Sequence, residues 1–424
     1  MIAQRTAARF LLAAILGSTA LTPALAAAPD KAAVVGTYAD IAAAGYADSL
    51  ATAQALKEAI DAFVSDPSPE AMQAAKAAWL SARVPYQQTE AFRFGNPIVD
   101  DWEGKVNAWP LDEGLIDYTE GDYGNEENPL AAVNIIATPK FEAGGQPIDA
   151  TEITPALLES LMEADDVEAN VTTGYHAIEF LLWGQDLHGT EHGAGARPWT
   201  DYAAGEGCTH GNCDRRAAYL AAAAALLVSD LEYMAGQWAE GGEARAAVTT
   251  DPDKGILAML TGLGSLSYGE LAGERMKLGL MLGDPEEEHD CFSDNTYNSH
   301  YYDGLGIRNV YLGEYVRVDG SVVSGPSLSD LVAAKAPDLD AAVRADLAAT
   351  MTALGRIKTA GEAGLSYDQM LDPANEAGGA LVAAAVDALV TQTQAIQRAA
   401  AAARGGEIAF EGSDSLDNPG AVQQ

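Results

Sequence analysis

The chain has 424 residues, of which 24 are basic and 62 acidic, so its formal net charge at pH 7 is −38. A surface this acidic repels phosphate backbones, and we therefore expect no nucleic acid partner. The length allows one large domain or two domains of ordinary size.

The first residues have the pattern of a secretory signal peptide. Arg5 and Arg9 supply positive charge, residues 10–20 form an apolar run, and Ala24-Leu25-Ala26 offers a cleavage site with small residues. We therefore predict that a signal peptide covers residues 1–26. The apolar run is too short to anchor the chain in a membrane, and no later stretch has the length of a membrane span. We expect a periplasmic protein that is not transmembrane after cleavage, with association at the outer membrane as an alternative.

Three cysteines are present. Cys208 and Cys213 enclose a loop of four residues and are a candidate disulfide in an oxidising compartment. Cys291 is then the odd cysteine, although a bridge from Cys291 to either of the others is equally compatible with the sequence. The pairing stays open at this stage.

Helical patterns dominate the chain, so we predict an all-α fold. The signals are apolar residues at helical spacing, capping residues followed by Pro, and Gly stops. The predicted long helices cover about residues 34–63, 68–94, 168–183, 214–238, 252–282, 327–335, 339–363 and 376–403, with shorter helices opening at Pro129 and Pro155. We expect irregular structure at 96–128 and 283–310, and a hairpin at 311–323 that turns at Asp319-Gly320.

Long helices with short stops favour two similar four-helix-bundle-like halves with irregular inserts. We place the N-terminal bundle at residues 27–200 and the C-terminal bundle at 201–404, divided near the Gly-rich loop at 185–212. Residues 405–424 lack periodicity, and we predict a disordered tail there.

The helix expected around residues 168–183 carries the most informative pair. His176 and Glu179 are its only acidic or basic side chains between Gly174 and Trp183, and a spacing of three places them on one helical face. Because no solvated face remains, we expect this helix to be buried. A buried carboxylate must be paired or bind a cation. The two residues could therefore bond each other, pair with an arginine, or bind a metal.

The same segment does not match a zinc peptidase motif. A zincin has Glu directly after its first His and a second His four residues on, whereas Ala177 and Phe180 stand at these positions. Two ligands are also too few for a catalytic zinc site. The His-x-x-Glu spacing recurs at 188–191, in a Gly-rich loop. The reversed spacing, Glu-x-x-His, occurs at 286–289, in an acidic turn that we expect to be solvated. Enzymatic activity stays open at this stage, and the motif argues against it.

The segment Gly174–Glu179 resembles the GxHxxE signature of the imelysin family, also called insulin-cleaving membrane protease-like, and most closely its iron-regulated protein A-like branch. Four further segments resemble family segments in the expected order: Tyr86–Arg93, Trp109–Asp112, Arg197–Tyr202 and Ser267–Arg275. The similarity covers nearly all of the chain that follows the signal peptide.

This resemblance implies two similar four-helix bundles with a functional site between them, a periplasmic or outer-surface location, and a role in iron uptake or homeostasis. It also carries a peptidase assignment. A family His and Glu map onto His176 and Glu179. Further candidates fall in matching segments: Glu90, Arg93, Asp112, Ser267 and Arg275.

Three functions compete. The first is binding of iron, zinc or a small iron-linked ligand, with His176, Glu179, Glu90 and Asp112 as metal ligands and with ligand contacts from Arg93, Ser267 and Arg275. The second is a zinc-dependent metallopeptidase. The third is a docking module for an outer-membrane or redox partner, in which His176 and Glu179 are a buried strut. We rank binding first, docking second and peptidase third.

Overall fold

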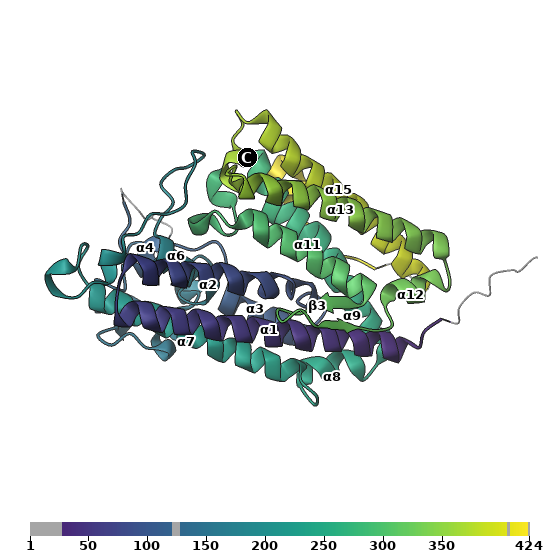
Figure 1. The fold of residues 1–424 in the computed structure, drawn as a ribbon, viewed down its shortest axis with the longest axis horizontal. Helices are drawn as coiled ribbons and strands as arrows, with labels where there is room; N and C mark the ends of the chain where they lie inside the picture. Colours follow the sequence, from purple (N-terminus) through teal and green to yellow (C-terminus); the bar gives the residue numbers. More distant parts are fainter. Residues whose placement is uncertain (1–27, 121–127, 405–407, 423–424) are drawn as a thin grey trace, which may run out of the picture.

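The computed structural model describes residues 28–120, 128–404 and 408–422 (Figure 1). The predicted signal peptide lies outside these ranges. The fold is all-α, as predicted. Within the described residues the β structure consists of two antiparallel hairpins, β1 (Lys140–Ala143) with β2 (Gln146–Asp149) and β3 (Glu314–Val316) with β4 (Val322–Ser324). The second hairpin lies where the sequence predicted one.

The first half of the chain forms one bundle, in the lower part of Figure 1. Helix α1 packs along α2 and α7, and α6 contacts α2, α3 and α7. The bounds are α1 (Lys31–Ser65), α2 (Pro69–Gln87), α3 (Pro97–Asn107), α6 (Gly174–Trp183) and α7 (Cys213–Trp238). Short helices complete this half: α4 (Glu113–Ile116), α5 (Pro155–Leu161) and α8 (Glu243–Thr249).

The second half forms another bundle above the first (Figure 1). Its first long helix changes from α-helix to π-helix and back. The α9 part of this helix also lies against α1 and α8 of the first bundle, and α13 packs between α11 and α15. The bounds are α9 (Pro252–Ser265), the π-helix Leu266–Lys277, α10 (Leu278–Leu282), α11 (Thr296–Leu312), α13 (Pro337–Glu362) and α15 (Glu376–Arg404). Short helices are α12 (Leu328–Ala333), α14 (Tyr367–Leu371), α16 (Asp414–Asp417) and α17 (Pro419–Val422).

Local capping explains where several helices begin. Ser68, Thr154 and Asp251 each accept a hydrogen bond from a backbone N–H two or three residues later, and each is followed by Pro in the first turn. The side chain satisfies an N–H that the helix leaves unpaired, and Pro has no N–H to lose. These starts agree with the predicted ones.

The two bundles meet along α11, which contacts α2 of the first bundle as well as α13 of the second. The prediction of irregular structure at 283–310 is wrong from Thr296 onward, because Thr296–Leu312 is helical. Apolar periodicity missed it since the helix buries polar groups, including Ser299, His300 and Asp303. The prediction for 96–128 is wrong in a similar way, because α3 and α4 lie there.

Two features of domain organisation differ from the expected boundaries. Helix α7 lies beyond residue 200 but packs along α1 and α6, and Arg216 in its first turn forms an ion pair with Asp117 of the first half. Residues 408–422 of the expected disordered tail lie against the π-helix and α9. There the backbone N–H of Glu411 donates to the Ser265 hydroxyl, and Ser415 is buried.

Two helical stretches, Cys213–Thr249 and Glu376–Ala402, are long and apolar enough to cross a membrane by length and composition, each with a mean hydropathy of 1.3. The expectation that no later stretch would have this length is therefore wrong. In this fold both stretches are bundle elements, with α7 packed on α1 and α15 packed on α13.

Cys208 and Cys213 are joined in a disulfide, and Cys291 is a free, buried thiol. The disulfide closes the loop that leads into α7.

Candidate metal site and acidic cavity

Helix α6 is held at the centre of the first bundle, where all ten of its residues are buried. Its first residue, Gly174, has a φ of +83°, and a Cβ there would lie 2.5 Å from the carbonyl oxygen of Val106 at the end of α3. The preceding hydroxyl of Thr173 donates to the Lys105 carbonyl at 2.9 Å. Only glycine lets the chain turn into α6 this close to α3.

The His176 and Glu179 side chains are wholly buried and bond each other, with 3.0 Å between Nδ1 and Oε2. The other oxygen of Glu179 accepts hydrogen bonds from the backbone N–H and hydroxyl of Ser293, at 3.0 and 2.6 Å. The Nε2 atom of His176 is buried and has no hydrogen-bond partner among the described residues. Glu179 therefore holds Nδ1 of this imidazole in place, whereas Nε2 is available to bind a ligand.

His289 and Asp290, from the segment before α11, lie next to His176. The ring of His289 lies 4.7 Å from that of His176, centroid to centroid, and the ring of Trp109 lies 5.1 Å from it. Candidate ligand atoms of His176, His289 and Asp290 all lie within 4.8 Å of one another, and all three residues are buried. Two imidazoles and a carboxylate are a donor set that suits iron, zinc or copper.

Arg83 of α2 fixes the carboxylate of this group. Its Nη2 donates to Asp290 at 2.6 Å and lies 3.4 Å from Nδ1 of His289, while Nη1 donates to the Asn107 side chain at 2.6 Å. Burial alone would raise the pKa of Asp290, but the Arg83 guanidinium holds it below the usual value. Asp290 is therefore an ionised carboxylate that already has a cationic partner.

Burial sets the charge of the remaining groups. It lowers the pKa of His176 well below the usual range, and Arg83 lowers it further. Burial and then Arg275 lower the pKa of His289 in the same way. Both imidazoles are neutral near pH 7, which is the form that binds a metal. Burial, followed by the nearby charge of Asp290, raises the pKa of Glu179.

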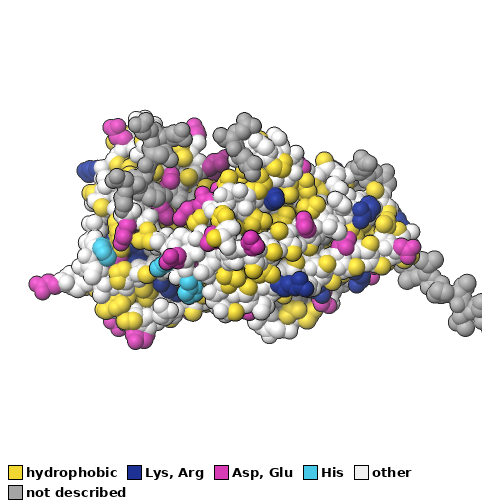
Figure 2. Space-filling view, turned by 90° about the horizontal axis from the view of Figure 1, so that it is seen from above, with side chains coloured by type: hydrophobic (Ala, Val, Ile, Leu, Met, Phe, Trp, Pro, Cys, Tyr) yellow, Lys and Arg dark blue, Asp and Glu magenta, His cyan; other side chains and the backbone are white. Residues whose placement is uncertain are grey.

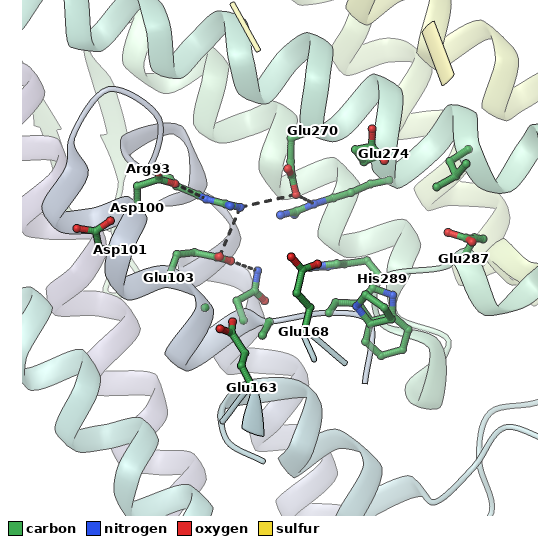
Figure 3. Close-up of a pocket in the computed structure, with 17 residues that line it drawn as sticks. Arg93, Asp100, Asp101, Glu103, Glu163, Glu168, Glu270, Glu274, Glu287 and His289 are labelled. Atoms are coloured by element: carbon green, nitrogen blue, oxygen red, sulfur yellow. Dashed lines mark hydrogen bonds and ion pairs between the residues drawn. The ribbon is translucent and has the colours of Figure 1, made fainter. Parts of the chain in front are cut away.

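An acidic cavity with a volume of about 570 Å³ opens beside this group and reaches His289 (Figure 3). Eight carboxylates line it, against two arginines. The acidic residues are Asp100, Asp101, Glu103, Glu163, Glu168, Glu270, Glu274 and Glu287. A concentration of negative charge in a concave surface attracts cations.

The two arginines of the cavity, Arg93 and Arg275, cross-link its walls. Arg275 bonds Glu90 and Glu270, each at 2.8 Å, and lies 3.2 Å from Asp303. Arg93 bonds Asp100 at 2.9 Å and approaches Glu103 and Glu270 at 3.4 and 3.8 Å, as the dashed lines in Figure 3 show. Arg275 comes from the π-helix, whose wider turn is frequent at functional sites.

The sequence-predicted residues separate into three sets. His176 and Glu179 lie at the buried group, and Arg93 and Arg275 line the adjoining cavity. The structure places the others elsewhere: Glu90 pairs with Arg275, Asp112 accepts a hydrogen bond from Asn128, and Ser267 accepts one from Gln392 at 2.6 Å in a buried position. None of these three belongs to the ligand group around His176.

Sequence reasoning missed His289, Asp290 and Arg83. The turn at 286–289 was expected to be solvated, whereas His289 is only 5 % exposed and Glu288 is fully buried. Spacing within one helix could not reveal these partners, because they come from other elements. The one local signal is the apolar pair Cys291-Phe292, which follows the acidic turn directly and is buried.

The fold and the site define a class of protein: two helical bundles with a buried histidine and glutamate beside an acidic cavity. The chain belongs to the imelysin family, whose profile it matches over residues 42–396. A curated relative, iron-regulated protein A of Synechococcus elongatus, is 34 % identical over 71 residues. That match spans 16 % of this chain and only 20 % of the relative's length.

Two solved structures share the fold. An iron-regulated protein A precursor from Parabacteroides distasonis superposes with a TM-score of 0.63 at 20 % identity, covering 89 % of this chain and 96 % of that one. An imelysin-like protein from Psychrobacter arcticum gives a TM-score of 0.54 at 15 % identity, covering 91 % and 99 %. At these identities the likeness establishes the fold alone.

Proposed function

We propose that this protein binds a divalent transition metal ion, with iron the expected ion and zinc an alternative, or a small iron-linked ligand, at His176 and His289. In this proposal it acts in iron uptake or homeostasis after export to the periplasm. The name of its curated relative, iron-regulated protein A, favours iron. A partner at the outer membrane or in the periplasm stays a prediction.

The observation that carries the proposal is the buried, unpartnered Nε2 of His176 beside His289 and Asp290. A buried polar atom without a partner is unfavourable, and a metal ion would satisfy it. Glu179 then acts as a positioning residue, because it holds Nδ1 and leaves Nε2 to point at the ion. This role differs from the predicted one, in which Glu179 was itself a ligand.

The acidic cavity supports the same proposal by providing an approach for cations. Acidic side chains are also spread over the face of the molecule shown in Figure 2, with few lysines and arginines between them. For a chelated ion, Arg93 and Arg275 are the groups in the cavity able to contact the anionic part of the chelate.

The test is metal binding by protein that has been treated with a chelator. We expect calorimetry to detect binding of Fe²⁺, under anaerobic conditions, or of Zn²⁺. His176→Gln and His289→Gln should each weaken binding at least tenfold, because each removes one ligand atom. Glu179→Gln should weaken it about 10–100-fold by loosening His176.

The matched control is His188→Ala, which removes an exposed imidazole from the loop after α6. We expect it to bind metal as the wild type does. Negligible binding by the wild type, or equal binding by the His176 and His289 variants, would overturn the proposal.

Zinc-dependent peptide hydrolysis is the second candidate. The sequence offered two ligands on one helix, but the structure assembles three candidate ligands beside a cavity, which is the number that a catalytic zinc site needs. Against it, Asp290 is already occupied by Arg83. Incubation of zinc-loaded protein with an unfolded protein substrate, with and without chelator, decides between the two. Cleavage that the chelator abolishes would favour the peptidase.

A further inference from the structure

A second group of carboxylates lies apart from the His176 group. Oxygens of Asp186, Glu288 and Asp294 all lie within 4.8 Å of one another. Asp186 belongs to the loop that follows α6, and the other two belong to the segment that leads into α11. A fourth carboxylate, Asp368 of α14, lies close enough to raise the pKa of each of the three.

Glu288 is the informative member. It is fully buried, and neither of its carboxylate oxygens has a hydrogen-bond partner among the described residues. Its oxygen faces those of Asp186 and Asp294. A buried carboxyl group in such surroundings requires a proton or a cation.

Several other buried carboxylates in the described part of the chain are paired with arginine. Asp290 pairs with Arg83, Asp117 pairs with Arg197 and Arg216, and Glu90 pairs with Arg275. No described lysine or arginine forms an ion pair with Asp186, Glu288 or Asp294. The carboxylates of Asp186, Glu288 and Asp294 are therefore not balanced by a lysine or arginine among the described residues.

We propose that Asp186, Glu288 and Asp294 form a structural site for a hard divalent cation, of which Ca²⁺ fits best. All three donors are oxygens, which hard cations prefer. Ca²⁺ takes about six to eight oxygen ligands in a flexible geometry, whereas Mg²⁺ demands a near-ideal octahedron and gives up its water reluctantly.

Such an ion would clamp the loop after α6 to the segment before α11. The first site is built on adjoining parts of the chain: α6 presents His176 and Glu179, while the segment before α11 presents His289, Asp290 and Ser293. Glu288 directly precedes His289, and Asp294 directly follows Ser293. The backbone hydrogen bond from Gly195 to the Phe292 carbonyl, at 2.9 Å, already joins the two segments. The cation site does not depend on the proposed function of the first site.

The experiment is thermal unfolding of protein stripped with a chelator and then titrated with CaCl₂ or MgCl₂. We expect Ca²⁺ to raise the Tm by several degrees in a saturable way, and Mg²⁺ to act only at higher concentration. Glu288→Gln and Asp294→Asn should each abolish this rise. Glu288→Gln should also unfold at a higher temperature than the wild type when Ca²⁺ is absent, because it removes an uncompensated buried charge.

The matched control is Glu287→Gln, which removes the same charge one residue away, at the acidic cavity. It should keep the full response to Ca²⁺. His176→Gln should keep it too, so the two sites can fail independently. The proposal is overturned if Ca²⁺ leaves the Tm of the wild type unchanged, or if Glu288→Gln and Asp294→Asn respond as the wild type does. If Glu288→Gln does not fold, Asp294→Asn and calorimetric binding of Ca²⁺ to the wild type decide the matter.

Discussion

At the scale of single residues, the acidic cavity places carboxyl groups where water is scarce. Glu103 is the clearest case, because it is only 6 % exposed. Its oxygens accept a hydrogen bond from Asn107 at 2.9 Å and lie 3.4 Å from the Arg93 guanidinium. Burial, followed by the neighbouring charge of Glu90, raises the pKa of Glu103 to about 7.

This shift predicts a dependence of stability on pH. The folded-state pKa of about 7 exceeds the ordinary glutamate value of 4.5, so the favourable contribution is complete below pH 4.5 and is lost as the pH rises through 7. The loss amounts to at most about 3 kcal/mol in the free energy of unfolding. We expect Glu103→Gln to remove this part of the decline, as measured by urea unfolding at pH 4.5, 6 and 7.5.

Glu168→Gln, which changes an exposed carboxylate on the wall of the same cavity, is the control and should keep the wild-type slope. A slope that is identical in Glu103→Gln and the wild type would contradict the prediction.

At the scale of elements, the backbone geometry at the start of α6 controls where His176 points. The positive φ of Gly174 and its contact with Val106 allow no side chain. Packing of α6 against α3 thus explains why the GxHxxE signature begins with glycine. The histidine two residues later is explained by its place in the candidate metal site.

We expect Gly174→Ala to reduce the free energy of unfolding by roughly 3 kcal/mol or more, since it combines an unfavourable φ with a clash against backbone atoms. Gly236→Ala in α7 is the control, because a Cβ there meets nothing within 4 Å. It should leave stability unchanged or raise it by up to about 1 kcal/mol. Chemical denaturation of both variants measures the difference, and equal effects would show that Gly174 is not required by packing.

At the scale of the whole molecule, buried polar contacts join the two bundles. Arg83 of α2 bonds Asp290, which precedes α11, and Arg317 and Tyr315 of the β3–β4 hairpin bond Asp48 of α1. Contacts of this kind depend on both partners, because removing one leaves the other buried and unpaired.

A double-mutant cycle on Arg83 and Asp290 tests this coupling. Arg83→Met should cost about 3–5 kcal/mol, because Asp290 then stays buried without its cation. In the double variant with Asp290→Asn the total cost should fall well below the sum of the two single costs. Urea unfolding in the presence of a chelator measures the cycle without any contribution from bound metal. Additive costs would mean that the pair does not link the bundles.

Local signals in the sequence determined most of the helices and half of the candidate site. Caps at Ser68, Thr154 and Asp251 act within three residues, so they can be read directly from the chain. The pairing of His176 with Glu179 follows in the same way from helical spacing. The family resemblance identified the segments of Arg93 and Arg275, both of which line the cavity.

Only the tertiary structure decided which residues complete the sites. Arg83 is far in the chain from His289 and Asp290, and nothing in the local sequence records that they meet. Helix α11 was missed for the same reason, since its polar residues are buried by contacts with α2 and α13 rather than by a pattern of its own. Short-range geometry depends on neighbours in sequence, whereas the charge balance of a buried site depends on neighbours in space.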